Sequence, residues 1–199
     1  MAIAFDIHLF ISTFLLIFIA ELPDKTAFAT LLMASKGHPI AIFIGVAAAF
    51  LVQTLVAICF GKVFSFLPPH WVHIGSGILF LAFAVVAWLK REEQSEEASH
   101  QNNESAVPRS GSLMKEAAGA FIVIFIAEWG DLTQIATAAL VAKYKSPWTI
   151  FSGAVLGLWS ATALAIFVGN RAQKIVNPVL LQKIAAFAFA GVGIAILVT

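Results

Sequence analysis

Two short acidic segments carry the residues of this chain that could do chemistry. The run 18–26 reads FIAELPDKT, and the run 125–134 reads FIAEWGDLTQ. Each places a glutamate three residues before an aspartate inside an otherwise apolar stretch. These acids are Glu21, Asp24, Glu128 and Asp131. Carboxylates at bilayer depth are costly, so they mark a site for an ion or a proton. A duplicated acidic motif therefore predicts a cation pathway at the interface between two repeats.

The candidate ligands in and around both motifs are hard oxygens. Oxygen sites suit Mg²⁺, Ca²⁺ and Mn²⁺, and neither motif holds the His or Cys that a Zn²⁺ or Cu⁺ site would use. Backbone carbonyls freed at Pro23 and Gly130 could add to the side-chain oxygens. The supporting candidates are Thr26, Thr133 and Gln134. In the second apolar span, Gln53 and Thr54 either line the pathway or make hydrogen bonds between helices, and both interpretations stay open.

The spacing of the acids predicts how the site would work. Residues i and i+3 share a helix face, so the two acids of each motif point the same way. Four carboxylates in one dry cavity cannot all stay charged without a cation, so the cluster must hold protons or metal. Exchange of protons for a cation follows naturally. The alternative is that the acids are structural and are tied to Lys25 or Trp129 in helix packing.

Lys25 makes the two motifs unequal. It is the basic residue inside the first motif, and Leu132 takes its place in the second. We expect Lys25 to pair with a motif carboxylate or to extend toward an interface. If it partly neutralises the empty first half-site, Glu128 and Asp131 would bind the cation more strongly.

The composition is that of an integral membrane protein. Of 199 residues, 60% are hydrophobic and 12% charged, with mean hydropathy +0.93, whereas soluble domains carry about a quarter charged residues. The net charge of +1 indicates no nucleic-acid partner. The single cysteine, Cys59, excludes an internal disulfide and a thiolate cluster and is expected to be buried. No Lys or Arg lies in residues 1–8, so no removable signal peptide is expected.

The predicted fold is all-α with six transmembrane helices. A hydrocarbon core of about 30 Å needs roughly 20 helical residues. The apolar segments lie near 7–34, 39–61, 70–89, 114–142, 147–169 and 178–198. The first and fourth are too long for one straight span and carry Pro23 or Gly130 near the middle. Both are therefore expected to be kinked or broken at the acidic motif.

The chain divides into two repeats joined by a linker. Repeat 1 covers 1–89, the polar linker 90–113, and repeat 2 covers 114–199. Beyond the motifs, Pro39, Phe43, Gly45 and Gly61 align with Pro147, Phe151, Gly153 and Gly169. Three spans in each half force the second half upside down in the bilayer, so we expect an inverted repeat. The linker is expected to be a disordered tether, with a regulatory or metal-sensing role through His100 as the alternative.

The charge distribution predicts the orientation. Of the eleven acids, six lie between Glu92 and Glu116 and are counted with the linker side, Asp6 is near the N-terminus, and the other four are the motif acids. Eight lysines and arginines fall on the linker side, against Lys62, Lys143 and Lys145 on the other. The richer side should be cytoplasmic, which places both termini outside.

At these motifs the chain resembles a family of small manganese(calcium)/proton exchangers with Golgi, chloroplast and bacterial members, related to the lysine exporter superfamily. The family signature is E-x-G-D-[KR]-[ST], once in each repeat. Pro23 replaces its glycine in the first motif, and Leu132 replaces its basic residue in the second. The resemblance covers the whole chain.

The resemblance implies Mn²⁺, and in some members Ca²⁺, carried against protons, with no resident cofactor and no enzymatic activity. It implies that Glu21, Asp24, Glu128 and Asp131 bind the cation. The supporting set is Lys25, Thr26, Gln53, Thr133 and Gln134. We expect manganese export across a bacterial inner membrane, with a Ca²⁺/H⁺ antiporter as the alternative.

Two further classes remain as alternatives. An intramembrane aspartyl protease would use Asp24 and Asp131 as a dyad, but it leaves the adjacent glutamates without a role. A structural or assembly protein would need a binding domain that the loops do not offer. Many small transporters form homodimers, and no patch in the sequence identifies such an interface.

Overall fold

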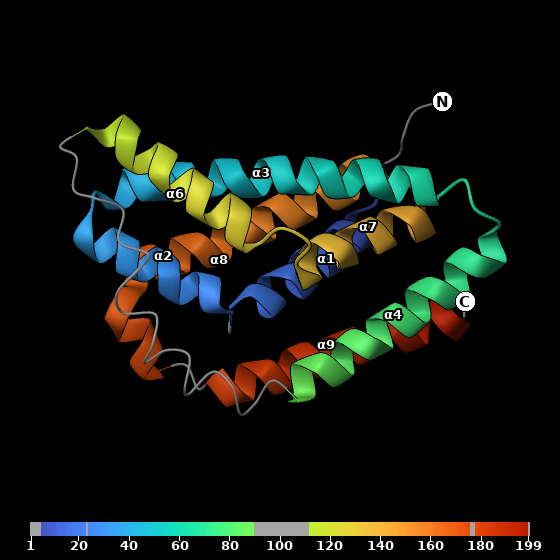
Figure 1. Ribbon diagram of the computed structural model, residues 1–199. Coiled ribbons are helices and arrows are strands. Elements are labelled where there is room, and N and C mark those ends of the chain that lie inside the picture. The colour runs from blue at the N-terminus through green and yellow to red at the C-terminus, as the bar shows by residue number, and fades with distance from the viewer. Residues whose placement is uncertain (1–4, 23, 90–111, 176–177, 199) are drawn as a thin grey trace.

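The computed structural model describes residues 5–22, 24–89, 112–175 and 178–198, without the side chains of Lys25, Phe28, 168–179 and Leu181 (Figure 1). Within these ranges the regular elements are all helices, as the sequence predicts. They are α1 (Ile7–Glu21), α2 (Lys25–Lys36), α3 (Pro39–Phe64), α4 (Pro69–Leu89), α6 (Leu113–Ala127), α7 (Leu132–Tyr144), α8 (Pro147–Ile175) and α9 (Pro178–Val198).

The six predicted apolar segments correspond to these helices. Three helices, namely α3, α4 and the 147–167 part of α8, are long and apolar enough to cross a membrane. The bent pair of α6 and α7 would make a fourth crossing. Helix α1 and the 182–198 part of α9 are apolar but shorter. The chain therefore has the helices of a membrane protein.

Both long segments are broken at their acidic motifs. Helix α1 ends at Glu21 and α2 begins at Lys25, whereas α6 ends at Ala127 and α7 begins at Leu132 after a bend of 71°. Gly130 has φ +78°, a left-handed conformation that glycine adopts at little cost. Pro23, the expected cause of the first break, lies outside the described residues. The breaks leave helix ends beside the acids.

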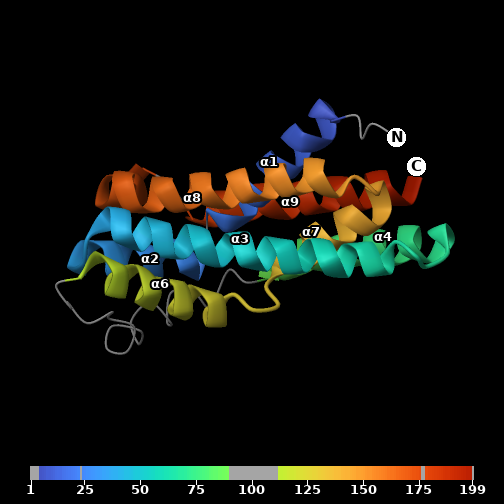
Figure 2. The same ribbon diagram turned by 90° about the horizontal axis from the view of Figure 1, so that it is seen from above.

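The helices pack in pairs that follow the sequence repeat. Helix α1 packs on α8, α6 packs on α3, and α4 packs on α9. Seen from above, α3 and α8 lie side by side along the length of the bundle (Figure 2). In each half of the chain, the first helix thus packs against the second long helix of the other half.

Two glycines permit these close approaches. A methyl group at Gly45 on α3 would overlap the carbonyl oxygen of Ala117 on α6. At Gly153 on α8, a methyl group would lie 2.9 Å from the carbonyl oxygen of Phe10 on α1. Gly45 aligns with Gly153 in the repeat, and the two contacts join corresponding helices. The repeated glycines are therefore explained by helix packing.

The bundle has two distinct ends. The first turn of α1 and the last turn of α9 lie at one end, called here the terminal end (Figures 1 and 2). The end of α2 and the start of α6 lie at the opposite end, called here the linker end. Residues 90–111 of the predicted linker lie outside the described part of the chain.

Burial corrects one expectation about a single residue, that of Cys59, and reveals a contact at Glu116. Glu116, the last of the six acids between Glu92 and Glu116, is buried in the first turn of α6 at the linker end. Its Oε2 accepts hydrogen bonds from the backbone N–H of His38 at 2.7 Å and from His38 Nδ1 at 3.0 Å. Glu116 thus joins the α2–α3 turn to α6. Cys59, expected to be buried, is exposed, because its position on α3 faces away from the bundle interior.

Candidate cation site

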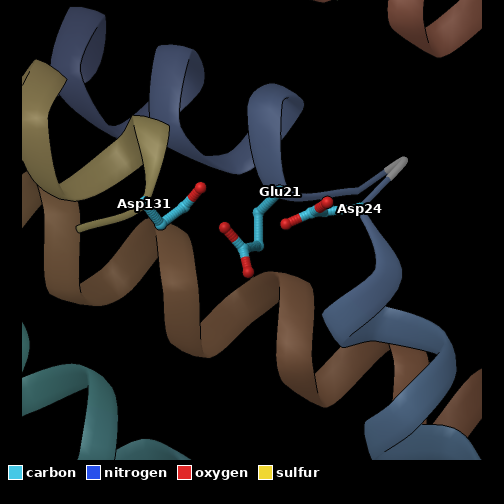
Figure 3. Close-up of side chains that lie close together, drawn as sticks. All are labelled: Glu21, Asp24 and Asp131. Carbon is cyan, nitrogen blue, oxygen red and sulfur yellow. The ribbon is translucent and has the colours of Figure 1, made fainter. Parts of the chain in front are cut away.

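Three of the four motif carboxylates converge at the helix breaks. Glu21 is the last residue of α1, Asp24 precedes α2, and Asp131 precedes α7. One carboxylate oxygen from each lies within 4.8 Å of the others. Figure 3 shows Glu21 between the two aspartates, with the three carboxylates directed toward one another. Residues 107 or more apart in sequence therefore form one oxygen-rich group of a kind that could hold a divalent cation.

Glu21 is the most constrained member of this group. Its side chain is 3% exposed, and neither of its carboxylate oxygens has a hydrogen-bond partner among the described residues. A buried, unpaired carboxylate is strongly unfavourable, so it is normally neutralised by a proton or paired with a cation. The environment of Glu21 therefore calls for one or the other.

Asp131 is oriented by the helix that follows it. Its Oδ2 accepts hydrogen bonds from the backbone N–H of Thr133 at 3.2 Å and from Thr133 Oγ1 at 2.8 Å. This is N-cap geometry, in which an aspartate satisfies a free N–H in the first turn. Thr133 thus holds one Asp131 oxygen and supports the position of this carboxylate.

Glu128, the fourth acid, lies beside this group but adds no oxygen to it. It is buried, and its Oε1 accepts a hydrogen bond from Thr26 Oγ1. Thr26 and Thr133 are equivalent in the repeat, yet they bind differently. Thr133 bonds the aspartate of its own motif, whereas Thr26 bonds the glutamate of the other motif. The two half-sites are unequal in this arrangement.

Gln53 and Gln134 fasten the second break to α3. The Nε2 of Gln53 donates to the carbonyl of Phe125 at 3.1 Å. The Nε2 of Gln134 donates to the carbonyl of Gln53 at 3.2 Å, and Gln134 Oε1 accepts from the backbone N–H of Gly130 at 2.8 Å. The bonds to the Phe125 carbonyl and the Gly130 N–H satisfy backbone groups at the break, and the bond to the Gln53 carbonyl joins Gln134 to α3. Both glutamines are therefore placed to hold the break in position.

Thr54, the other polar candidate of the second span, combines the two roles that the sequence left open. Its Oγ1 donates within its own helix, to the carbonyl of Phe50 at 2.7 Å, and its side chain lines a small cavity that Glu128 and Asp131 also line. The side chain of Lys25 lies outside the described part of the structure. Its pairing with a motif carboxylate stays a prediction.

Small cavities lie on either side of Asp131. One of about 50 Å³ is lined by Asp24, Asp131, Thr133 and Gln182, together with apolar residues of α1, α4, α7 and α9. The other, of about 10 Å³, is lined by Glu128, Gln53 and Asp131 among others. About 10–15 Å³ of such volume is needed for one water molecule. The first cavity could therefore take a cation that keeps only part of its water.

Gln182 is a site residue that the sequence analysis missed. It is the polar side chain that α9 contributes to the 50 Å³ cavity, and it is buried. The sequence shows Gln182 beside Lys183 at the start of a long apolar run, but nothing linked the sixth span to the motifs. Its side chain adds a polar amide to a cavity that Asp24 and Asp131 also line.

Replacing Gln182 by Leu is expected to lower the affinity of the site for a divalent cation by about 10-fold, because the cavity loses a polar group. The measurement is cation-dependent flux in reconstituted vesicles over a range of cation concentrations. Ser76→Ala is the matched control, since it removes a buried polar side chain on α4 that lies outside this cavity. Equal effects of the two substitutions would assign Gln182 to packing alone.

Comparisons with known proteins identify the family of the chain. The chain is 32% identical to the GDT1-like protein sll0615 of Synechocystis sp., covering 81% of this chain and 82% of that protein. It is 30% identical to Protein PAM71, chloroplastic, of Arabidopsis thaliana, covering 81% of this chain and 49% of that protein. For the GDT1-like protein C17G8.08c of Schizosaccharomyces pombe, the identity is 27%, with coverage of 78% and 70%.

The chain spans about half the length of the chloroplast relatives. No solved structure matches. The family described as "Divalent cation/proton antiporter GDT1" matches residues 9–95 and 116–199, so the match includes both acidic motifs and most of the described helices. The chain therefore belongs to the GDT1 family of divalent cation/proton antiporters and is a transporter rather than an enzyme.

Proposed function

We propose that this protein exports Mn²⁺ from the cytoplasm in exchange for protons, with Glu21, Asp24 and Asp131 as the primary cation ligands and Glu128 as the adjoining acid. The observation that carries the proposal is the buried Glu21 carboxylate, unpartnered among the described residues and within 4.8 Å of two further carboxylates. Such a group binds protons or a cation, and it exchanges one for the other when either becomes available.

The broken helices support both states of the exchange. The α2 and α7 N-termini meet the carboxylates, and their partial positive charge stabilises the acids while no metal is bound. The C-termini of α1 and α6 lie beside the same acids, where the Glu21 carbonyl accepts from the Asp24 N–H and the Phe125 carbonyl accepts from Gln53. A carbonyl oxygen has two lone pairs, so these groups can still offer an oxygen to a cation, as in broken-helix transporters.

We further propose that six spans form two inverted three-span repeats. The helix contacts support this arrangement, because the first helix of each half packs on a long helix of the other half: α1 on α8, and α6 on α3. The equivalent contacts at Gly45 and Gly153 support it too, because an internal two-fold axis would generate one from the other. Such an axis brings the two motifs together in mid-bundle, where a cation can be reached in turn from each side.

The same proposal gives the orientation. Lys36 ends α2 and Lys115 lies in the first turn of α6, so both are at the linker end. Lys62 and Lys143, in the last turns of α3 and α7, are at the terminal end. With the linker end richer in basic residues over the whole chain, we place it in the cytoplasm of a bacterial cell and the termini outside.

The number of oxygen ligands bears on the choice of Mn²⁺ over Ca²⁺. Both ions accept carboxylate and amide oxygens, but Ca²⁺ takes six to eight ligands. Three carboxylates beside a 50 Å³ cavity suit a smaller coordination shell. Together with the family resemblance, this favours Mn²⁺.

The test is flux of Mn²⁺ and of Ca²⁺ into proteoliposomes with an imposed pH gradient. We expect Mn²⁺ flux that a tenfold excess of Ca²⁺ inhibits only weakly. Glu104→Gln, which neutralises an acid of the predicted linker, is the control and should leave flux unchanged. Ca²⁺ flux without Mn²⁺ flux would make the protein a Ca²⁺/H⁺ antiporter, and no flux of either ion in folded protein would overturn the proposal.

A further inference from the structure

The break between α6 and α7 lies open on the surface of the bundle. Ala127, Trp129 and Gly130 are all exposed, Trp129 by 56%. In the first motif, the repeat equivalent of Trp129 is Leu22, which is half-buried. Helix α6 lies at one edge of the bundle, beside α3 (Figure 2). The chain therefore covers Leu22 more fully than it covers the equivalent residue of the second motif.

The exposed break carries backbone carbonyl groups without partners. Among the described residues, nothing donates a hydrogen bond to the carbonyls of Ala127, Trp129 or Gly130. The Glu128 carbonyl between them differs, because it accepts from the N–H of Asp131 at 3.3 Å. The indole N–H of Trp129 also has no acceptor in the described part of the chain. One surface thus presents both an unused donor and unused acceptors.

The depth of the break makes this exposure unfavourable in lipid. Helix α6 has 15 residues and α7 has 13, or about 22 Å and 20 Å, so in the proposed six-span arrangement the break lies near the bilayer midplane. Irregular backbone at that depth must be buried in protein or face water. Tryptophan is enriched at the membrane interfaces rather than at the midplane. Acyl chains are therefore a poor cover for Trp129 and its neighbours.

The surface that leads to the break is apolar, which favours protein over water as its cover. Ala118, Ile122, Ile126 and Trp129 are exposed and lie three or four residues apart, so they share the outer face of α6 and are called here the α6 stripe. The ring of Phe125 packs edge-on against the Trp129 ring, with their centroids 4.9 Å apart. The small side chain of Ala118 would let another helix approach closely. The α6 stripe has the character of a helix-packing surface.

We propose that the α6 stripe and the α6–α7 break form the interface of a homodimer, in which a second copy of this chain covers the break. A two-fold axis along the membrane normal places equivalent residues of the two copies at the same depth, so break meets break. Each copy then offers its Trp129 indole N–H to the exposed carbonyls of the other. The donors and acceptors are self-complementary, as a two-fold interface requires.

This inference goes beyond the proposed exchange activity, although it rests on the six-span arrangement proposed with it. The interface adjoins the cation site, because Trp129 and Gly130 separate Glu128 from Asp131 in the chain. On the inner side of the break, Gln134 holds the Gly130 N–H. The second copy would hold the outer side.

Disulfide crosslinking in membranes tests the interface without transport. In a Cys59→Ala background, the variants Ala118→Cys, Ile122→Cys and Ile126→Cys would be oxidised at a low protein-to-lipid ratio, and dimers measured on a denaturing gel. Leu15→Cys is the matched control, because Leu15 is the repeat equivalent of Ile122 and is exposed by 47% against 55%. We expect at least one of the three variants to form about 10-fold more dimer than the control, because a disulfide needs Cα atoms within about 7 Å. Equal, low crosslinking at all four positions would overturn the dimer.

Trp129→Phe tests the hydrogen bonds across the interface. It keeps an aromatic ring at the break but removes the indole N–H, so crosslinking of Ile122→Cys should fall by about 5-fold. Trp148→Phe is the control, since it removes an exposed indole from the first turn of α8 at the terminal end. Equal crosslinking in the two variants would contradict the role given to the Trp129 N–H.

These outcomes are separable from the proposed function. Crosslinking reports the distance between two copies whether or not the wild type carries Mn²⁺. If crosslinking succeeds and flux fails, the dimer stands and the exchange activity is wrong. If flux succeeds and every cysteine variant stays monomeric, the exchanger stands and the dimer is overturned.

Discussion

Asp131→Asn is expected to reduce proton-driven Mn²⁺ flux by more than about 100-fold, since loss of a second-shell partner alone costs 10–100-fold in metal affinity. Asp131 supplies one of the three converging carboxylates, so the substitution removes a charge from the cation site. Asparagine also caps helices well and keeps an oxygen to accept the bonds from Thr133, so the start of α7 should be preserved. Flux in proteoliposomes, normalised to the amount of folded protein, is the measurement.

Thr133→Val tests the hydrogen bond that orients Asp131 separately from the negative charge of Asp131. It removes the 2.8 Å hydrogen bond to Asp131 but leaves the carboxylate, so a smaller loss of about 10-fold is expected. The order of the two effects matters more than their size. If Asp131→Asn transported Mn²⁺ at the wild-type rate, or lost no more than Thr133→Val, Asp131 would not be a cation ligand.

Gly45→Ala is expected to produce the largest loss of stability among single methyl additions at the glycines described above. The new methyl group would overlap the Ala117 carbonyl, which is backbone and cannot swing aside. Overpacking of this kind costs about 1–3 kcal/mol, which corresponds to a fall of about 2–12 °C in Tm for a protein of this size. Thermal unfolding of the purified protein in detergent measures the effect.

Gly75→Ala is the matched control for this prediction. Gly75 lies within α4, and a methyl group there would meet no atom within 4 Å. Alanine also favours helix by up to about 1 kcal/mol over glycine, so Gly75→Ala should be neutral or slightly stabilising. If the two variants unfolded at the same temperature, the close α3–α6 contact would not be required for the fold.

Much of the helical arrangement could be predicted from local sequence. Apolar runs of about 20 residues define the spans, and Gly130 marks a break because its left-handed backbone suits no other residue as well. The convergence of Glu21 with Asp131 could be anticipated because the motifs repeat. Such features need only length, hydropathy and backbone preference.

Other features depend on tertiary contacts that sequence spacing does not contain. Glu116 is buried where its carboxylate accepts a hydrogen bond from the His38 backbone N–H. These residues are 78 apart, and no helical or repeat spacing in the sequence relates them. Gln182 reaches the site only because α9 packs beside α1 and α4. Thr26 crosses to Glu128, although its repeat equivalent bonds within its own motif. An exact repeat would have predicted the wrong partner for Thr26.

The unequal binding of the two threonines bears on how the site would release its cation. Asp131 and Glu128 each have one oxygen held by a threonine, whereas Glu21 has neither oxygen held by a described residue. Proton uptake at Glu21 would therefore disturb the fewest hydrogen bonds. We expect Glu21 to be the acid whose protonation competes most directly with the metal, an expectation that agrees with its burial.

Measurement of proton movement during Mn²⁺ entry is the most direct test that the protein exchanges Mn²⁺ for protons at the Glu21 site. Proteoliposomes loaded with a pH indicator would receive an Mn²⁺ gradient with no initial pH difference. We expect Mn²⁺ entry to drive protons out of wild-type vesicles. Collapse of the resulting pH gradient by a protonophore should change the rate of Mn²⁺ entry. Glu21→Gln should abolish both the Mn²⁺ and the proton movement. Mn²⁺ entry with no proton movement, or proton-coupled entry that Glu21→Gln leaves intact, would contradict this mechanism.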